Sequence, residues 1–352
     1  MRALEKLALP VLKSLNSELA HDLSILILKS NLASKPNNFT SKRLRTNLCG
    51  LQLPNPLGLA AGFDKNAKVV RQLVNIGFGF IEVGAATPLP QKGNPKPRIF
   101  RLDEDAAIVN RLGFNNQGIK KIKQRLDKYS SHGVIGINIG ANKNSLDQTN
   151  DYCQVLAEIH SSVDYATINI SSPNTKSLRS LQNQDSLRKL LLKIHKTKIN
   201  FTDTLPIFLK IAPELTIHEI QEISALAVEY KIDGIIATNT TLKRTNLNSK
   251  NKIQQGGLSG KPLFTESNKI LAQFSKELDG KIPLIGVGGI SSAKDAYSKI
   301  KAGASVVQLY SALIFNGFSL VEKIIKDLDE LLKNDNYTNV QQAVGVEREK
   351  WL

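Results

Sequence analysis

Cysteine is scarce in this sequence, which has two, Cys49 and Cys153, among its 352 residues. Two cysteines are too few for the disulfide framework of a secreted domain, and their spacing matches no metal site. We therefore expect two reduced thiols in a cytoplasmic protein and no metal centre.

Long apolar runs are also missing. The longest early run is Ile25–Leu28, whereas a membrane-spanning helix needs about 18 apolar residues. Charges at Glu5, Lys6, Lys13 and Glu18 interrupt the first apolar segment, so it lacks the pattern of a signal peptide. We expect neither a spanning helix nor a cleaved leader.

Acidic and aromatic residues are in short supply. The 31 acidic residues face 47 Lys and Arg, a formal net charge of +16, which favours an anionic partner. The basic residues are spread along the chain and aromatic residues make up 6%, so a basic stripe with stacking side chains is not evident. This argues against nucleic acid and leaves an acidic lipid surface or a small anionic ligand.

The first 40 residues predict a small domain of two amphipathic helices. Asn16 or Ser17 can cap the second helix, and residues 31–41 have the composition of a linker. Residues 1–45 hold eight basic against three acidic side chains, so the polar faces are basic. Apolar residues at helical spacing are Leu4, Leu7, Ala8, Val11, Leu12 and Leu15, then Leu19, Ala20, Leu23, Leu26 and Ile27, widened by Ile25, Leu28 and Leu32.

Residues 41–352 predict an α/β domain in which short apolar strands alternate with amphipathic helices. The candidate strands are Leu57–Ala60, Phe80–Val83, Val134–Ile139, Tyr165–Ile170, Ile207–Lys210, Gly234–Ala237, Leu284–Val287 and Ser305–Leu309. Their number fits a closed (β/α)8 barrel, although a doubly wound open sheet gives a similar count. Nearly every strand ends in polar or glycine residues, which a barrel would gather at one mouth. We therefore predict a (β/α)8 barrel behind the two-helix domain.

Glycines after the seventh strand predict a phosphate site. Gly286, Gly288 and Gly289 precede a helix, and glycine lets backbone N–H groups approach an anion there. The loop after the eighth strand often completes such a site in barrels, and here it carries Tyr310 and Ser311. A turn that is merely tight is the alternative.

Lysine and asparagine residues mark the predicted mouth. Lys65 and Lys210 follow the first and fifth strands, where one could face the electron-rich ring of a reduced flavin and the other a substrate carboxylate. Asparagine amides donate and accept hydrogen bonds together, which suits a flat heterocycle with imide and amide edges. The asparagines concerned are Asn110, Asn115, Asn138, Asn169, Asn174 and Asn239.

A serine loop, residues 169–175, follows the fourth strand. Proline after Ser172 favours an extended backbone there. None of the five histidines stands at a strand end, so a Ser–His–Asp hydrolase is poorly supported. A serine that acts on protons remains open.

These clusters, in this order, resemble the dihydroorotate dehydrogenase family. The resemblance runs from about residue 55 to 315, and "ELAHDL" and "NVQQAVG" extend it toward both ends. Its motifs are "LAAGFDKN", "GNPKPRIFRL", "NRLGFNN", "NISSPNT", "LKIAPEL", "ATNTT", "GGLSGKPL", "IGVGGI" and "VQLYSALIF". Serine at position 172, where the soluble class has cysteine, together with the helical N-terminus, resembles the membrane-bound class that reduces quinone.

The resemblance implies that FMN is the cofactor and that (S)-dihydroorotate is oxidised to orotate in pyrimidine synthesis. Ser172 would remove the C5 proton while hydride moves from C6 to N5 of FMN. Cofactor contacts carried over are Ala61, Gly62, Phe63, Asp64, Lys65, Ala85, Asn138, Asn169, Lys210, Thr238, Gly260, Gly289, Tyr310 and Ser311. Substrate contacts are Lys65, Asn110, Arg111, Leu112, Gly113, Phe114, Asn169, Asn174, Asn239 and Thr240. His21 and Arg101 match positions near the quinone tunnel.

The resemblance also implies a peripheral protein on the cytoplasmic face of the inner membrane, held at an anionic surface by its first two helices. Alternatively, both helices only cover the mouth of the barrel. The sequence names no proton acceptor for Ser172, and a water chain aided by Thr175 is our expectation. The segment after Gly345 matches nothing recognised in the family.

Two other functions are weighed. A tRNA dihydrouridine synthase is also an FMN barrel acting on a pyrimidine, but it would need a catalytic cysteine, and neither Cys49 nor Cys153 lies in the serine loop. The second is a non-catalytic protein that binds an anion or RNA. Flavin absorbance of the purified protein separates these possibilities.

Overall fold

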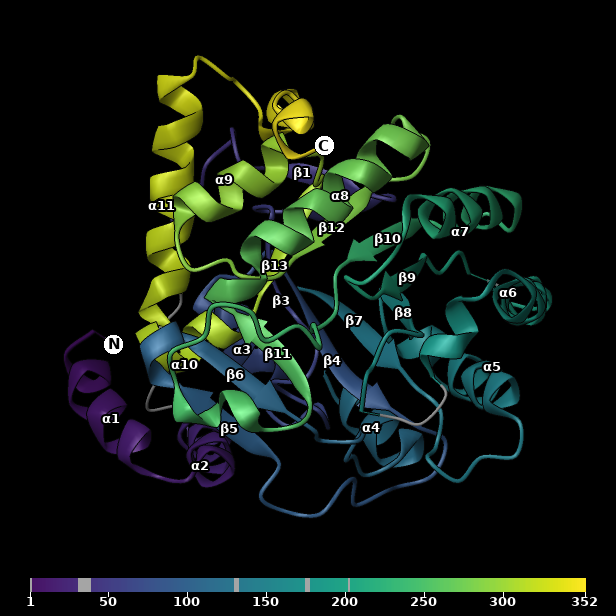
Figure 1. Cartoon of the computed structure of the whole chain (residues 1–352), viewed down its shortest axis with the longest axis horizontal. Coiled ribbons are helices and arrows are strands. Elements are labelled where there is room, and N and C mark those ends of the chain that lie inside the picture. Colours follow the sequence, from purple (N-terminus) through teal and green to yellow (C-terminus); the bar gives the residue numbers. More distant parts are fainter. Residues whose placement is uncertain (1, 31–38, 130–132, 175–177, 202) are drawn as a thin grey trace.

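The computed structural model describes residues 2–30, 39–129, 133–174, 178–201 and 203–352 (Figure 1). Within these ranges eight parallel strands close into a barrel in the order β3-β4-β7-β8-β9-β10-β12-β13. Their bounds are β3 (Leu57–Leu59), β4 (Phe80–Ala86), β7 (Val134–Ile139), β8 (Tyr165–Asn169), β9 (Ile207–Ile211), β10 (Gly234–Ala237), β12 (Leu284–Val287) and β13 (Val306–Leu309). The predicted (β/α)8 barrel is confirmed. The largest difference is β4, which runs three residues beyond the expected Val83.

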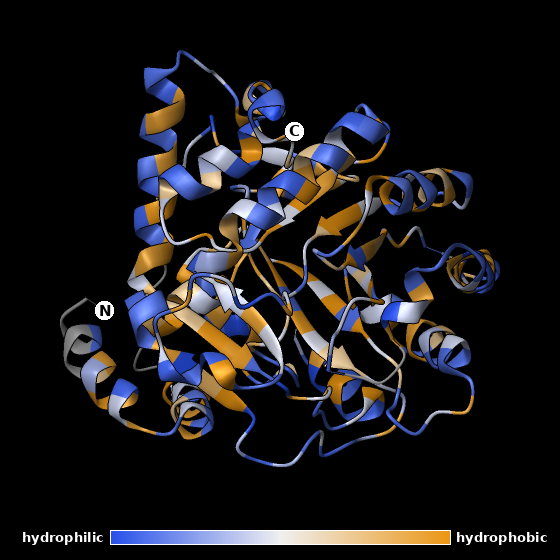
Figure 2. Cartoon of the chain, viewed as in Figure 1, coloured by the Kyte–Doolittle hydropathy of each residue, from blue (hydrophilic) through white to orange (hydrophobic). Residues whose placement is uncertain are grey.

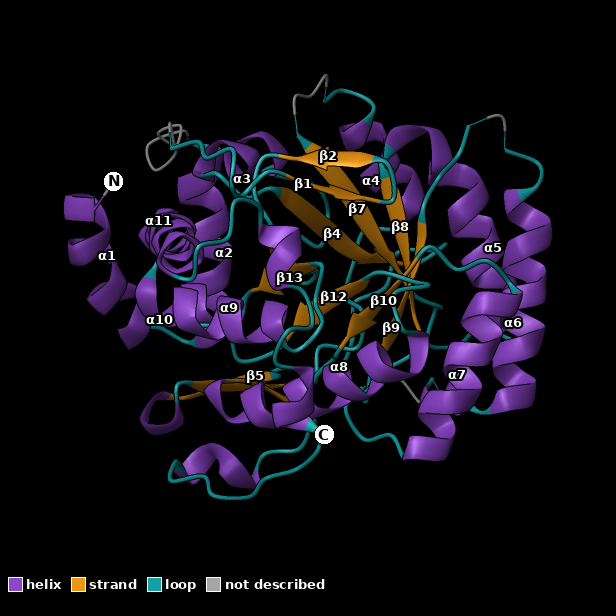
Figure 3. Cartoon of the chain, turned by 90° about the horizontal axis from the view of Figure 1, so that it is seen from above, coloured by secondary structure: helices purple, strands orange, loops and turns teal. Residues whose placement is uncertain are grey.

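The barrel interior changes from apolar to polar along each strand. At one end a hairpin of β1 (Thr46–Leu48) and β2 (Leu51–Leu53) closes the barrel over Phe80, Tyr165 and Phe208 (Figure 3). Side chains on a strand alternate between faces, so the residues two positions further on also point inward. These are Glu82, Thr167 and Lys210, and on β13 Gln308 follows Val306 in the same way. The interior therefore turns polar toward the carboxyl ends of the strands.

Amphipathic helices surround the barrel. In Figure 2 most carry a hydrophobic side and a hydrophilic side, as a single buried face requires. On α5, for example, Tyr152, Val155, Leu156 and Ile159 are buried at helical spacing. The helices are α3 (Val70–Ile76), α4 (Ile119–Leu126), α5 (Gln148–Ile159), α6 (Gln184–Lys198), α7 (Ile217–Glu229), α8 (Phe264–Leu278), α9 (Ala293–Lys301), α10 (Ser311–Asn316) and α11 (Ser319–Asn334).

Smaller elements surround the carboxyl end of the barrel and its flanks. An antiparallel sheet of β5 (Ile99–Leu102), β6 (Ala107–Asn110) and β11 (Gly257–Gly260) lies at the end opposite the β1–β2 hairpin (Figure 3). Short 3-10 helices are η1 (Asp103–Asp105), η2 (His160–Ser162), η3 (Arg179–Gln182), η4 (Lys250–Ile253), η5 (Lys261–Leu263), η6 (Val340–Ala343) and η7 (Arg348–Trp351).

The two predicted N-terminal helices are α1 (Arg2–Ser14) and α2 (Ser17–Lys29), which lie beside β5 at one edge of the molecule (Figure 1). Asn16 caps α2, since its side-chain oxygen accepts from the backbone N–H of Glu18 at 3.0 Å. The apolar residues of α2 are divided between two sides of the helix. Ala20, Ile25 and Leu28 are buried, whereas Leu19, Leu26 and Ile27 are exposed. The helix therefore has apolar side chains on both sides.

Polar contacts tie α1 and α2 to the barrel domain. Glu5 accepts from the backbone N–H groups of Phe318 and Ser319 at the start of α11. The buried guanidinium of Arg98 pairs with Glu18 at 2.7 Å. Arg101 donates to carbonyls at the end of α1, including that of Leu15 at 2.8 Å. Whether residues 1–40 fold as a separate domain stays a prediction.

Candidate active site

A single pocket gathers most of the predicted site residues at the carboxyl ends of the strands; we call it the mouth pocket. Phe114, Ser172 and Tyr310 are among the residues that line it. Further predicted residues along its wall are Ala61, Gly62, Lys65, Ala85, Asn110, Leu112, Gly113, Asn138, Asn169, Asn174, Lys210, Thr238, Asn239, Thr240, Gly260, Gly289 and Ser311. Residues from sequence positions 60 to 316 thus meet in one place.

Three of the predicted cofactor and substrate contacts lie outside the mouth pocket. The carboxylate of Asp64 turns back and accepts from the backbone N–H groups of Lys68 and Val69, at 2.9 and 2.7 Å. Phe63 lines a neighbouring cavity instead. The guanidinium of Arg111 stacks on Phe100 at 4.6 Å and so points away from the pocket. Their neighbours in sequence line the pocket, but these side chains have other partners.

A second cavity of about 360 Å³ lies between the N-terminal helices and the barrel; we call it the side cavity. His21 and Arg101, the two predicted quinone-site residues, both line it. Most of the remaining wall is apolar. Its other lining residues include Ala8, Leu9, Leu12, Ala20, Ile27, Leu28, Phe63, Leu313, Ile314 and Phe318. Ile99, Ile108, Ile314 and Tyr310 line both cavities, so a single layer of side chains separates them.

Lys65 lies where the two cavities approach each other. Its Nζ is 3.3 Å from Nε2 of His21. Burial lowers the pKa of Lys65 to about 8, although the charges of Asp22, Asp64 and Glu18 oppose that shift. Burial, together with the charge of Lys65, holds the pKa of His21 well below its usual range. At neutral pH the ammonium of Lys65 therefore donates to a neutral imidazole.

The floor of the mouth pocket consists of a chain of amides. Asn169 donates from Nδ2 to Oδ1 of Asn138 at 2.9 Å. Asn239 donates in turn to Oδ1 of Asn169 and to the hydroxyl of Ser171, at 3.3 and 3.0 Å. Beside them lies Lys210, whose ammonium has neither a hydrogen bond nor an ion pair to another residue that the structure describes. A buried, unpaired cation beside a chain of amides suits an anionic heterocycle.

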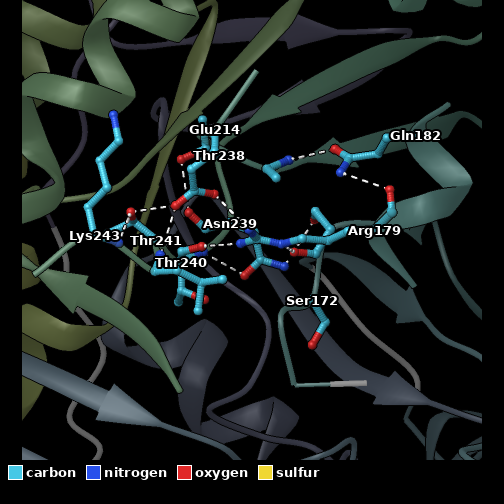
Figure 4. Close-up of polar contacts among 12 residues, drawn as sticks. Ser172, Arg179, Gln182, Glu214, Thr238, Asn239, Thr240, Thr241 and Lys243 are labelled. Atoms are coloured by element: carbon cyan, nitrogen blue, oxygen red, sulfur yellow. Dashed lines mark hydrogen bonds and ion pairs between the residues drawn. The ribbon is translucent and has the colours of Figure 1, made fainter. Parts of the chain in front are cut away.

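Ser172 is 6% exposed and lines the pocket. Its Oγ accepts from the backbone N–H of Asn174 at 3.3 Å. Figure 4 shows the Ser172 side chain directed away from the neighbouring ion pair of Arg179 and Glu214. Thr175, which we expected to aid proton transfer, lies outside the described residues. The serine hydroxyl is thus directed at the pocket rather than engaged in the ion pair.

Arg179 and Glu214 hold the serine loop in place, a role the sequence analysis missed. The guanidinium of Arg179 pairs with Glu214 at 2.8 Å and donates to the carbonyl of Thr240 at 3.0 Å and that of Ser171 at 3.3 Å (Figure 4). It therefore joins the loops that follow β8, β9 and β10. A glutamate three residues after the end of β9, in "LKIAPEL", was the available signal.

The predicted phosphate loop borders the mouth pocket at Gly288, Gly289 and Ser291. Both glycines have positive φ, at 120° and 74°, and a Cβ on Gly289 would lie 2.5 Å from Cβ of Phe264. Only glycine therefore fits there without movement of α8. Ser311, at the start of α10, is 2.8 Å from the hydroxyl of Ser259 across the pocket wall. Backbone N–H groups and hydroxyls thus surround this end of the pocket.

Two further searches of the described residues bear on function. No group of His, Cys, Asp and Glu there could hold a metal ion. No helix within the described ranges is both long and apolar enough to cross a bilayer.

Comparison with known proteins gives a consistent result. The family model for dihydroorotate dehydrogenase matches residues 43–332. "Dihydroorotate dehydrogenase (quinone)" of Cereibacter sphaeroides is 49% identical over 353 residues, covering 100% of both chains. The protein of the same name from Brucella anthropi is 46% identical and covers 99% of this chain and 97% of its own. The segment after Gly345 therefore has a counterpart in relatives, contrary to our expectation.

Solved structures agree with the sequence comparison. The ligand-free enzyme of Eimeria tenella superposes with a TM-score of 0.91 at 38% identity, covering 94% of this chain and 99% of that one. The same enzyme in complex with ferulenol gives a TM-score of 0.90 at 38% identity, with 94% and 95% covered. Its match to the family model and its full-length likeness to these relatives place the chain in the dihydroorotate dehydrogenase family, a family of flavin-dependent oxidoreductases.

Proposed function

We propose that this enzyme oxidises (S)-dihydroorotate to orotate with FMN in the mouth pocket and passes the electrons to a membrane quinone in the side cavity. The observation that carries the proposal is the adjacency of the two cavities. A pocket that contains two lysines and a chain of amides shares Tyr310 and three isoleucines with an apolar cavity beneath the amphipathic helices α1 and α2. The relatives named above carry quinone in their names.

The residues of the mouth pocket fit FMN. Gly288, Gly289 and Ser311 would hold the phosphate, because backbone N–H groups and hydroxyls border that end of the pocket. Lys210 and the amide of Asn138 would face the ring system. When bound, FMN supplies the hydride acceptor for the reaction.

The substrate would lie against the amides on the serine side of the pocket. Asn110 and Asn174 are 3.3 Å apart, so they present neighbouring amides to one ligand. Lys65 supplies a cation for the carboxylate of dihydroorotate. Ser172 lies beside this position and would accept the C5 proton as the hydride leaves C6. The products are orotate, a reduced cofactor and a proton.

Serine is a weak base, so its own proton must leave as the C5 proton arrives. Within the described ranges the Ser172 hydroxyl accepts from the backbone N–H of Asn174 and contacts no carboxylate or imidazole. We therefore assign the final proton acceptor to water. Arg179 holds the serine loop in position for this transfer by its hydrogen bonds to the carbonyls of Ser171 and Thr240.

Mass spectrometry of the molecule released from the denatured protein tests whether the cofactor is FMN. We expect the purified protein to be yellow and to release one FMN per chain on denaturation, without covalent attachment. Release of FAD would contradict the assignment of the phosphate end. A colourless preparation that does not take up FMN on incubation would contradict the flavin pocket itself.

Replacing Lys65 with methionine should weaken orotate binding by about 10- to 100-fold, because a charge-assisted hydrogen bond contributes roughly 1.5–3 kcal/mol. The measurement is a titration of the flavin absorbance with orotate. Lys68→Met, which removes an exposed cation three residues away, is the matched control and should change the dissociation constant less than threefold. Equal effects of the two substitutions would exclude a specific contact from Lys65.

The same titration should depend on pH. Burial lowers the pKa of Lys65 to about 8, so the cation is fully present below that pH and is lost as the pH rises through it. Orotate affinity should therefore be constant below about pH 8 and fall by up to tenfold per unit above it. In Lys65→Met this fall should disappear. If it persists, another group in the pocket is titrating.

A further inference from the structure

Glu82 is a carboxylate in the interior of the barrel with no place in the proposed reaction. It stands on β4, is 1% exposed and does not line the mouth pocket. An isolated buried carboxylate is costly, so its partners matter. Its Oε1 accepts from Nδ2 of Asn138 at 2.7 Å, and its Oε2 accepts from Nε2 of Gln308 at 2.9 Å. Both partners line the pocket, so the carboxylate lies directly behind the pocket floor.

The carboxylate fixes which way the floor amides point. A carboxylate only accepts hydrogen bonds, so Asn138 must direct its NH₂ group toward Glu82 and its oxygen toward Asn169. Asn169 then donates to that oxygen and presents its own oxygen to Asn239. One acceptor at the start of the chain thus sets the polarity of three amides in a row. An amide in place of Glu82 could support either polarity.

Glu82 also affects the charge of Lys210. Burial lowers the pKa of Lys210, and the charge of Glu82 opposes that shift. Tyr165 is the other titratable group beside the carboxylate, with its hydroxyl 3.4 Å from Oε2. Lys65, in the same pocket, draws its compensating charge from Asp22, Asp64 and Glu18 instead. The two lysines therefore have separate counter-charges, and that of Lys210 lies in the barrel interior.

We propose that Glu82 is a positioning residue for the flavin pocket, whose carboxylate orients the amides of Asn138 and Gln308 and balances the charge of Lys210. The effect of Glu82 on the flavin rests on the proposed function. Its effect on the charge of Lys210 does not depend on any cofactor. The two effects are tested by different measurements, so a failure of the proposed function can be told apart from a failure of the charge balance.

Glu82→Gln is the sharpest variant because it removes the charge and keeps the volume. The new amide oxygen can still accept from Asn138. Its NH₂ group can donate to Gln308 after that side chain rotates, since Oε1 of Gln308 is buried with no partner among the described residues. Thr167→Val is the matched control. Thr167 lies in register with Asn138 inside the barrel, and its hydroxyl likewise has no partner in the described part of the chain.

The first measurement is the midpoint potential of the bound flavin as a function of pH. A protonated Lys210 favours the electron-rich reduced ring, so the potential falls further once that proton is lost. In Glu82→Gln this fall of the potential should begin at a lower pH than in the wild type, whereas Thr167→Val should follow the wild type. Coincident profiles for Glu82→Gln and the wild type would overturn the role toward the flavin.

The second measurement is thermal unfolding, which does not depend on the cofactor assignment. Lys210→Met leaves Glu82 as an unbalanced buried charge, and removing that charge as well should relieve the cost. Glu82→Gln should therefore lower Tm in the wild type but raise it in the Lys210→Met protein. This cycle remains informative even if Glu82→Gln alone is too unstable to purify, since the double variant can still be compared with Lys210→Met. A Tm that falls on adding Glu82→Gln to Lys210→Met would overturn the charge balance.

Discussion

Replacing Ser172 with alanine should slow the reduction of bound flavin by dihydroorotate by about 100- to 10,000-fold, the range typical for loss of a general base. Flavin and orotate should stay bound, because the hydroxyl contacts only the backbone N–H of Asn174 among the described residues. The measurement is anaerobic stopped-flow absorbance. Ser172→Cys should retain more activity than Ser172→Ala, since a thiol can still take up and release a proton.

Ser171→Ala serves as the comparison for this prediction. Ser171 is the adjacent residue and is fully buried, but its hydroxyl faces Asn169 and Asn239 rather than the pocket. We expect the rate of flavin reduction in Ser171→Ala to stay within about tenfold of the wild type. If Ser172→Ala also stays within tenfold, about 1.4 kcal/mol in the barrier, Ser172 does not carry the proton transfer.

The second large effect concerns the exposed face of the N-terminal helices. Leu19 and Leu26 of α2 are 50% and 60% exposed, and Val11 of α1 is 61% exposed. A helix with apolar side chains on its free side and basic residues nearby is suited to the interface of an anionic bilayer. Burying a leucine contributes about 1.5–3 kcal/mol, so Leu19→Ser with Leu26→Ser should weaken binding to anionic liposomes by about 100-fold or more.

The same double variant should lose most of its activity with a long-tailed quinone but not with a short, water-soluble one. Leu146→Ser with Ile199→Ser is the matched control, because these side chains are at least as exposed, at 106% and 67%. They lie next to α5 and α6, on the opposite side of the molecule from α2 (Figure 1). Substitution is preferable to deleting residues 1–41, since Glu18 and Arg101 tie the helices to the barrel domain. Unchanged liposome binding would mean that the helices only cover the cavity.

Periodicity predicted the barrel well because a fully buried parallel strand is a short run of β-branched and apolar residues, as in Val134–Ile139 and Gly234–Ala237. The positions of the pocket side chains were predicted less well. Phe63, Asp64 and Arg111 belong to motifs whose neighbours line the pocket, yet each side chain turns to a partner distant in sequence or to the local backbone. The pattern of strands and loops in the sequence does not indicate which way such a side chain points.

Residues inside strands were the main omission. Glu82 and Gln308 interrupt apolar strands at inward-facing positions, which a period of two would have revealed. The apolar surface of α2 is wider than one buried face needs, as its sequence indicated. Leu19, Leu26 and Ile27 lie on the free side, because the chain buries Ile25 and Leu28 against the barrel core. A helix apolar on both sides has no single stripe for a sequence pattern to identify.

Anaerobic titration of the purified protein with dihydroorotate tests the central claim most directly. Each equivalent should bleach one equivalent of oxidised flavin and release one equivalent of orotate, and a quinone added afterwards should restore the flavin absorbance. A flavin that stays oxidised in excess dihydroorotate, in protein that does bind orotate, would contradict the proposed reaction.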